Sequence, residues 1–327
     1  SGNSKETICD RKIRGNAIVS EIRAILRDIP LGNQRTQIGL VLRQAWFING
    51  CFVNSEVWTG YSELDLKDLE VIDHDILRAI TGAQAKVPTE MLYLETAQVP
   101  IKSVIVVRRL LYLQTILHRH KNELTRQIYD AMKEEPLKDD WIHLVTKDMS
   151  DINLNLSDDQ ITKLSKSEFK ILVKAKMRNS AYVEFERVKQ GHSKVKHISH
   201  TGLKKSQPYL KDSRFSNKET SHLFNLRSQC VNEFKANFYT SICQFCKLHL
   251  DTQEDALSCN IFRRHMKKEH LEVLDSVTYN DLFSDSSSQH TITKVFLTII
   301  NTRELLRTPT MNQAYPGHRT GPVASTN

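Results

Sequence analysis

The feature that most constrains this chain is an apolar run from Ile38 to Val53, inside the segment PLGNQRTQIGLVLRQAWFINGCFVNSEVW at residues 30–58. Roughly 20 residues without an internal proline predict one long helix, and a helix that is apolar on nearly every side must be buried. Polar residues at Arg43, Gln44 and Asn49 interrupt the run, which argues against a membrane span. We therefore expect a helical bundle around this segment.

Apolar residues at helical spacing continue on both sides of this run. They predict helices over residues 5–28, 62–80 and 101–121, and two shorter ones within residues 123–150. Ser62 and Asp65 form a capping box before the second of these helices. Short connections between such helices indicate a compact bundle. His74, between two aspartates, is expected on a solvated face. Three residues are expected in the core rather than as stacking platforms: Trp46, Trp58 and Trp141.

A second, basic module is predicted to begin near residue 151, at the polar connector DINLNLSDDQ. Ser165 and Glu168 form a capping box for a helix that reaches about Gln190. Its inward face is expected to comprise Phe169, Leu172, Val173, Ala181, Phe185 and Val188. Its outward face carries four cations at strict four-residue spacing: Lys166, Lys170, Lys174 and Arg178.

Positive charge is concentrated in this module. Twelve Lys or Arg and three Glu lie between Lys163 and Lys205, a net of +9 against +8 for the whole chain. Such a surface favours polyanions, although a solvated lysine face is an equally good interpretation. The candidate phosphate contacts are the four cations of the outward face with His192, Lys194, Lys196, Lys204 and Lys205. Arg108 and Arg109 are a weaker candidate pair.

The remaining segments predict further helices. Ser216 and Glu219 form another capping box, and a last helix is expected over residues 291–307, before a disordered tail at residues 308–327. Tyr209 and Phe215 either stack on bases or fill a small local core. The core side of the helix after Ser216 is expected to comprise Leu223, Phe224, Leu226, Cys230, Val231 and Phe234.

Six cysteines are spread unevenly along the chain: Cys9, Cys51, Cys230, Cys243, Cys246 and Cys259. The sequence shows no hydrophobic leader, and Cys51 lies in an apolar helix, so a disulfide framework is not expected. An intracellular location, nuclear or cytoplasmic, is expected instead. The C-x2-C turn at Cys243 and Cys246, with Cys259 returning later, is the best metal candidate, for Zn²⁺. Three free thiols are the alternative of equal weight.

Several segments resemble, in this order, the C-terminal part of reverse transcriptases from non-LTR (LINE-type) retrotransposons. They are the segment at residues 30–58, KVPTEMLYLETAQVPIKSVIVVRRLLYLQTILHR, HSKVKHI, SHLFNLRSQ and DTQEDALSC. The resemblance covers nearly the whole chain, to about Arg307, and implies a piece of a longer protein. Upstream palm and fingers of the same polyprotein would then be its partners.

The resemblance also implies a division of the chain. Residues 1–29 would be the end of the palm and a connector helix, residues 30–150 the helical thumb, and residues 151–240 a basic nucleic-acid-binding module. Residues 241–307 would be a zinc-knuckle-like segment with C-terminal helices. In the family pattern a histidine stands four residues before the last cysteine, where this chain has Asp255. His249 and His265 are other possible fourth ligands.

The enzymology depends on one absence. Polymerases of this class hold two Mg²⁺ ions with aspartates, including a Tyr-x-Asp-Asp turn, and no such tetrapeptide occurs here. Asp139–Asp140 and Asp158–Asp159 are explained by helix N-capping. The catalytic palm and its Mg²⁺ would lie outside this chain, so the piece is not expected to polymerise.

The sequence therefore predicts a mainly α-helical protein: a thumb-like bundle, then a basic helical module with a small cysteine-containing hairpin. Its expected role is to bind template–primer, element RNA or target DNA for an RNA-directed DNA polymerase, with no membrane partner. Two alternatives stay open. One is a domesticated or decayed nucleic-acid-binding protein, and the other is a helical scaffold for protein interactions whose basic face is only solvated.

Overall fold

The structure is a computed structural model, and nearly every described residue that belongs to an element is helical. The residues that the structure describes are 4–29, 34–135, 137, 140–192, 195, 198, 200, 202–231, 242–243, 245–250, 252–276, 279, 283 and 286–307. Within them the sole β contact is an isolated antiparallel bridge between Ile242 and Leu250. The mainly α prediction and the small hairpin around the cysteines are confirmed.

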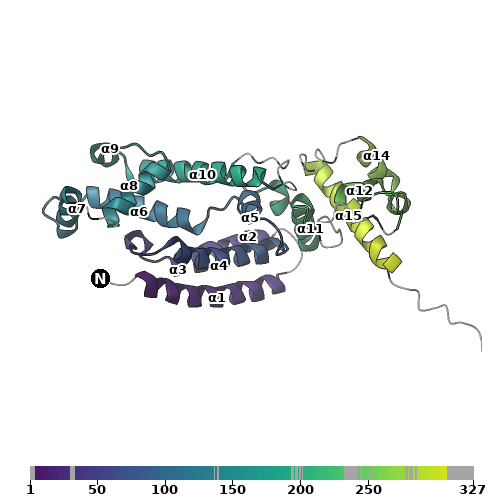
Figure 1. Ribbon diagram of the computed structural model, residues 1–327, viewed down its shortest axis with the longest axis horizontal. Coiled ribbons are helices and arrows are strands. Elements are labelled where there is room, and N and C mark those ends of the chain that lie inside the picture. Colours follow the sequence, from purple (N-terminus) through teal and green to yellow (C-terminus); the bar gives the residue numbers. More distant parts are fainter. Residues whose placement is uncertain are drawn as a thin grey trace, which may run out of the picture.

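The first part of the chain folds into a slab of packed helices (Figure 1). Its elements are α1 (Ser4–Asp28), α2 (Gln34–Leu42), the π-helix η1 (Arg43–Ile48), α3 (Asn49–Cys51), the 3₁₀ turn η2 (Ser55–Val57), α4 (Glu63–Thr81), α5 (Thr89–Thr96), α6 (Ile101–Leu117), α7 (Leu124–Glu134), α8 (Trp141–Asp151), α9 (Asp158–Lys163) and α10 (Lys166–Gln190). The layer of α1 and α4 lies beside α6, and α10 runs along the opposite edge. The predicted helices over residues 5–28, 62–80 and 101–121 are therefore present, the last ending at Leu117.

The central apolar stretch is helical from Gln34 to Cys51, but it is neither regular nor buried all round. Its middle is the π-helix η1, whose wider turn shifts the register of the side chains that follow. Phe47 and Cys51 are fully buried, whereas Val41 is 65% exposed and Trp46 is 37% exposed. The prediction of a fully buried helix is therefore wrong, and so is the prediction of a core position for Trp46. One face of α2 and η1 stays at the surface.

The other two tryptophans do belong to packed regions. Trp58 is buried beside Phe52, with ring centroids 5.9 Å apart. Trp141 is partly buried, and its indole Nε1 donates a hydrogen bond of 2.7 Å to the Glu56 carbonyl oxygen. These two core predictions hold, the second with one edge of the ring left near a surface hollow.

Helix ends follow the capping chemistry that the sequence contains. Four predicted or newly seen capping boxes are formed, each by a serine side chain that accepts from the backbone N–H three residues on: Ser62–Asp65, Ser157–Gln160, Ser165–Glu168 and Ser216–Glu219. Asp140 caps α8 in a similar way, accepting from His143 N at 2.7 Å. Capping by Ser and Asp satisfies amide groups that the first helical turn leaves unpaired.

Two interior clusters of apolar side chains hold the slab together. One joins α1, η1, α4 and α5 and extends into the C-terminal elements. The other lies among α6, α7, α8, α9 and α10, and includes Leu110, Val145, Phe169 and Val173. This second cluster runs across residue 151, so packing is continuous at the predicted domain boundary, and the proposed division of the chain stays a prediction.

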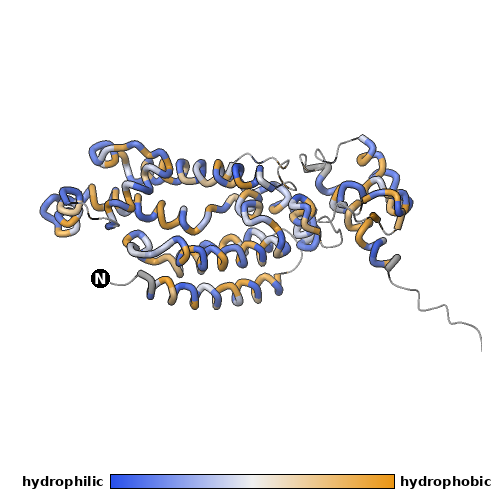
Figure 2. Tube along the Cα trace, viewed as in Figure 1, coloured by the Kyte–Doolittle hydropathy of each residue, from blue (hydrophilic) through white to orange (hydrophobic). Residues whose placement is uncertain are grey.

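The expected inward face of α10 is confirmed. Phe169, Val173 and Ala181 are buried, and Leu172, Phe185 and Val188 are partly buried. Figure 2 shows the corresponding alternation of hydrophilic and hydrophobic residues along this helix. One face of α10 therefore belongs to the core, and the other carries the cations.

The C-terminal elements lie at the end of the molecule opposite α7 and α9 (Figure 1). They are the 3₁₀ turn η3 (Pro208–Lys211), α11 (Asn217–Arg227), α12 (Gln253–Ser258), α13 (Asn260–Arg263), α14 (Lys268–Ser276) and α15 (Ser286–Arg307). The last helix begins earlier than predicted, at Ser286. Cys230 and Val231 are buried beyond the end of α11, while Phe234 and the expected disordered tail lie outside the described residues.

A tight contact docks α11 against the end of α4. Gly82 ends α4 with φ 68°, a left-handed conformation that favours glycine, and a Cβ atom there would overlap the Ser221 hydroxyl. Asn225 bridges the same corner, accepting from Gln84 N at 3.0 Å and donating to the Gly82 carbonyl oxygen at 3.1 Å. These two hydrogen bonds join the Asn225 side chain of α11 to the backbone at the end of α4, and so they hold α11 against the slab.

Among the described helices none combines the length and the apolar composition that crossing a bilayer requires. The central stretch, which Arg43, Gln44 and Asn49 interrupt, is included in this finding.

A candidate nucleic-acid interface

A groove of about 510 Å³ separates the outward face of α10 from η1 and α6. On one side lie three members of the predicted cation row, Lys170, Lys174 and Arg178. The other walls are formed by residues of η1, α3, α5–α6 and α6, among them Gln44, Asn49, Gln98, Val104, Val107, Arg108 and Leu111. Lys166 is exposed and continues the same row beyond the groove, toward the start of α10. We call Lys170, Lys174, Arg178 and the walls facing them the basic groove.

The cations of the basic groove face one another rather than carboxylates. The pKa of Lys174 is lowered, first by burial and then by the neighbouring charges of Lys170 and Arg178. In the described part of the chain no ion pair involves these three residues, although their helix also carries Glu184 and Glu186. Like charges at four-residue spacing destabilise a helix by roughly 0.2–0.5 kcal/mol per pair, so this arrangement is maintained at a cost to stability.

Arg108 and Arg109, the weaker predicted pair, have different environments. Arg109 is 1% exposed, and its guanidinium donates to Asp148 Oδ2 at 2.5 Å and to the Tyr61 hydroxyl at 2.7 Å. It is therefore unavailable to phosphate, and its assignment as a nucleic-acid contact is wrong. Arg108 lines the basic groove, but it is half-buried, and it donates to the carbonyl oxygens of Phe52 and Ile48. Burial lowers the pKa of Arg108.

The described members of the predicted cations beyond Gln190 do not line the basic groove. Lys204 and Lys205 are exposed, next to Leu203, which packs against Ala181 of α10. His192 is exposed and lies 3.7 Å from the Glu90 carboxylate. Lys194, Lys196 and His197 lie outside the described residues. The structure therefore brings together three of the four predicted cations of α10 and leaves His192, Lys204 and Lys205 outside the basic groove.

The two aromatic candidates for base stacking are core residues. Tyr209 and Phe215 are each 1% exposed, and the Tyr209 hydroxyl donates to Glu95 Oε2 at 2.7 Å. The alternative of a small local core is therefore correct. His74 is also partly buried, 5.5 Å from the Tyr93 ring, and burial lowers its pKa. The prediction of a solvated His74 is wrong because the Tyr93 side of α4 faces the core.

A buried polar cluster lies beside the C-terminal end of α10. Glu95 accepts from Arg227 Nη2 at 2.9 Å and from Tyr209, and His200 Nε2 lies 2.8 Å from Glu95 Oε1. Lys189 donates to Glu186 at 2.8 Å and to the Ile198 carbonyl oxygen. Burial alone raises the pKa of Glu95, but the charges and hydrogen bonds of Arg227 and His200 outweigh it and lower the pKa to about 2. This cluster fixes α5, α10, the loop before residue 200 and α11 to one another.

The cysteine segment brings three of the four predicted metal ligands together. The sulfur atoms of Cys243, Cys246 and Cys259 lie within 4.8 Å of one another. Cys243 N donates to the His249 carbonyl oxygen at 2.8 Å, which closes the turn, and Cys259 comes from the junction of α12 and α13. Three thiols this close can hold one metal ion such as zinc.

Backbone N–H groups donate hydrogen bonds to two of these sulfur atoms, and the balance with burial differs between them. Burial raises the pKa of Cys246, but the backbone N–H groups of Leu248 and His249 and the neighbouring thiols outweigh it, so the pKa is lowered. Burial raises the pKa of Cys259 to about 11, against hydrogen bonds from the backbone N–H groups of Phe262 and Ile261. Backbone N–H groups directed at sulfur are the outer contacts that stabilise metal-bound thiolates.

The fourth predicted ligand, Asp255, is directed elsewhere. Its carboxylate accepts from Thr252 Oγ1 at 2.6 Å in a cap at the start of α12, and its backbone N–H donates to the same hydroxyl at 3.0 Å. Neither Asp255, His249 nor His265 belongs to the group of close ligands found in the described residues. Asp255 is engaged by Thr252, the N-cap residue of α12, so the placement of Asp255 as a ligand is wrong.

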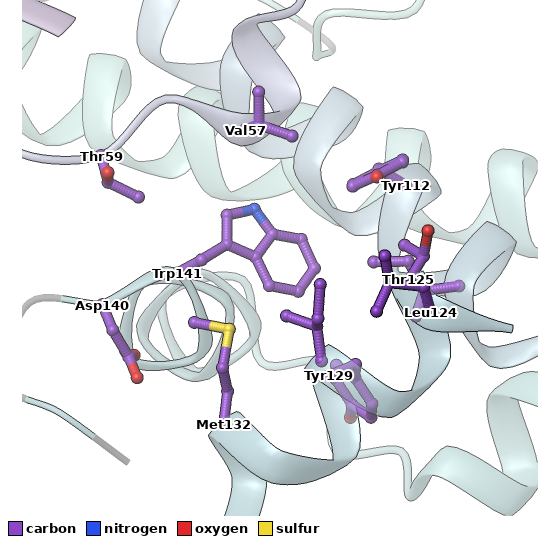
Figure 3. Close-up of a pocket in the computed structure, with 11 residues that line it drawn as sticks. Val57, Thr59, Tyr112, Leu124, Thr125, Tyr129, Met132, Asp140 and Trp141 are labelled. Atoms are coloured by element: carbon purple, nitrogen blue, oxygen red, sulfur yellow. The ribbon is translucent and has the colours of Figure 1, made fainter. Parts of the chain in front are cut away.

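A second hollow, of about 560 Å³, lies among α6, α7, α8 and η2 (Figure 3). Figure 3 shows Trp141 at its centre, with Met132 and Leu124 around it. Its lining is apolar apart from hydroxyl groups and Asp140, which caps α8. With no cation on its walls, this hollow is unsuited to phosphate.

Apart from Arg108, the second wall of the basic groove was not predicted from the sequence. Its residues come from segments that precede α10 by more than fifty residues, so no local pattern joins them to the lysines. One signal was present: Gln44 and Asn49 interrupt an otherwise apolar helix.

Comparisons with protein-family models, with curated proteins and with solved structures gave no match for this chain.

Proposed function

We propose that this chain is a nucleic-acid-binding module that grips phosphates through the basic groove. The observation that carries the proposal is the row of Lys170, Lys174 and Arg178 along one wall, without ion pairs in the described part of the chain. Such cations release counterions when they bind a phosphate backbone, which gives affinity with steep salt dependence. The cost of keeping like charges adjacent is consistent with a ligand that neutralises them.

The resemblance to non-LTR reverse transcriptases supports a more specific role. In this role the chain clamps RNA or DNA for an RNA-directed DNA polymerase, and the Mg²⁺-binding palm that performs the chemistry lies elsewhere in the same polyprotein. The helical slab would then act as the thumb and α10 as part of the module that follows it. The residues proposed to contact phosphate are Lys166, Lys170, Lys174 and Arg178.

Charge reversal tests the grip. The variant Lys170→Glu/Lys174→Glu should bind fluorescent oligonucleotides at least about tenfold more weakly, because two phosphate contacts become repulsive. The plot of log affinity against log salt should also become shallower: the magnitude of its slope should decrease by about 1.4–1.8, the contribution of two phosphates. Fluorescence anisotropy at several salt concentrations measures both quantities.

A matched control separates the groove from overall charge. Lys163→Glu/Lys176→Glu makes an equal change in net charge with two exposed lysines that do not line the basic groove. This control should keep most of the affinity. If the groove variant binds as tightly as the unmodified protein, the grip is excluded and the scaffold for protein interactions becomes the better interpretation.

We also propose that the three thiolates hold a structural Zn²⁺. Cys243 and Cys246 from the turn and Cys259 from the start of α13 would bind it, with the fourth ligand outside the three. The ion would join the turn to α13 in a region of short helices, where a small core benefits from a cross-link. The backbone N–H groups around Cys246 and Cys259 support this assignment.

Metal analysis of purified protein tests the site. We expect about one zinc per chain in the unmodified protein and its loss in Cys259→Ser. The control Cys9→Ser removes an exposed thiol of α1 and should leave the zinc content unchanged. Zinc retained in Cys259→Ser, or zinc absent from all three proteins, would exclude the proposed ligand set.

A further inference from the structure

We infer that the basic groove takes a single nucleic-acid strand with its bases turned toward η1 and α6, rather than a duplex. This inference rests on the proposed phosphate grip and concerns what else the groove contacts. It comes from the wall that faces the cations, which a pure phosphate site would not need.

The size of the groove favours a single strand. A volume of about 510 Å³ is in the range of small-ligand pockets and has room for roughly one or two nucleotides. A duplex is wider than its major groove, which is about 12 Å across. It can lie across the lysine row, but it cannot enter the space behind that row. Only an unpaired strand brings its bases inside.

The far wall of the groove carries apolar surface. Val104, Val107 and Leu111 follow helical spacing on α6, and all three are half-buried and line the groove, as does Met177 from α10. Charged phosphate gains nothing from aliphatic contacts, whereas the flat face of a base is apolar and loses contact with water when it packs there. This wall therefore suits unstacked bases.

Two amide side chains are placed to meet base edges. Gln44 and Asn49 are exposed in the groove, and Gln44 Nε2 donates to Asn49 Oδ1 at 3.2 Å. Arg108 Nη2 donates to the same oxygen at 3.3 Å. The Gln44 carbonyl oxygen and the Asn49 NH₂ group take no part in the hydrogen bond between these two side chains. They remain as an acceptor and a donor for a ligand. Amides recognise base edges through such pairs.

The π-helix is what places both amides on one face. Residues five apart lie on different sides of an α-helix but on the same side where the turn widens to i→i+5 bonding. Gln44 and Asn49 are five apart: Gln44 lies within η1, and Asn49 directly follows its last residue. Single-turn π-helices occur frequently at functional sites, and here the irregularity builds a wall of the groove.

Three labelled probes of one length test the inference: a mixed-sequence single strand, the same strand with abasic sites, and the duplex. The unmodified protein should bind the base-containing strand at least about fivefold more tightly than the abasic strand. The variant Gln44→Ala/Asn49→Ala should lose about 3–10-fold on the base-containing strand, because two hydrogen bonds are removed, and should bind the abasic strand unchanged. Gln37→Ala, an exposed amide of α2 outside the groove, is the control and should match the unmodified protein.

The outcomes distinguish this inference from the phosphate grip. Equal affinity for abasic and base-containing strands, or an amide variant that loses nothing, overturns base entry and leaves the grip intact. A duplex that binds more tightly than the single strand overturns it as well. If Lys170→Glu/Lys174→Glu leaves all three affinities unchanged, the proposed function itself fails.

Discussion

Two groups of cations in this protein have opposite surroundings. Arg43, Arg109 and Arg227 are buried, and each is paired with a buried or nearly buried carboxylate. Lys170 and Lys174 of α10 are exposed and lie beside other cations of the basic groove. Buried arginines are retained for structure, and exposed unpaired lysines are available to a ligand.

Each buried arginine is paired across the fold. Arg43 Nε donates to Asp73 Oδ1 at 2.6 Å, and its Nη1 donates to Gln98 Oε1 at 2.8 Å. Arg109 pairs with Asp148, and Arg227 pairs with Glu95. In each case a guanidinium fork joins two or more helices, as bidentate geometry allows. These three buried arginines thus join elements within the fold.

Breaking one internal joint gives the largest expected effect. Glu95→Gln leaves Arg227 buried without its carboxylate, so we expect the free energy of unfolding to fall by about 3–5 kcal/mol. Urea denaturation followed by circular dichroism measures it. Glu184→Gln, which removes the carboxylate of an exposed pair with Arg187, should leave the urea midpoint unchanged. A Glu95→Gln protein as stable as its Glu184→Gln counterpart would remove the distinction between the two groups of cations.

Acid should weaken the same joint before the rest of the fold. The pKa of Glu95 in the folded protein is about 2, against an ordinary value of 4.5. A carboxylate with a depressed pKa stabilises the fold above its unfolded pKa, and this contribution is lost as pH falls from about 4.5 to about 2. We expect about 3 kcal/mol of stability to disappear over that window.

A comparison of the unmodified protein with Glu95→Gln separates the contribution of Glu95 from that of the other carboxylates. Urea midpoints of the unmodified protein and of Glu95→Gln, measured across the same pH range, should converge as the pH falls. The charged and titratable groups that contact Glu95 are Arg227, His200 and Tyr209, and all three are present in both proteins. Midpoints that stay separated by a constant amount would show that Glu95 does not titrate in this window.

Local chemistry in the sequence predicted the helices well. Three capping boxes, at Ser62, Ser165 and Ser216, were recognised from residue spacing alone, and each is formed. These features depend on residues three positions apart, so the chain carries the whole signal. The inward face of α10 was predictable for the same reason, because helical periodicity decides it.

Partners across the fold were not predictable. Arg109 and Lys174 are both basic residues on helices. Arg109 is buried in an ion pair with Asp148, whereas nothing in the described chain neutralises Lys174. The π-helix at η1 also has no recognisable signal in its sequence, and it decides which side of the helix Trp46 occupies. The turn of cysteines was predictable, but the engagement of Asp255 by Thr252, in place of a ligand role, was not.

The smallest expected effect tests the exposed group itself. If the cations of the basic groove repel one another, Lys174→Gln should raise the free energy of unfolding by about a few tenths of a kcal/mol at low salt. The gain should shrink in high salt, where the repulsion is screened within about 3–10 Å. Lys176→Gln, an exposed lysine of the same helix outside the groove, is the matched control and should change stability less. A destabilised Lys174→Gln protein would mean that Lys174 has a stabilising partner within the fold, and the case for a ligand that neutralises the row would lose its physical basis.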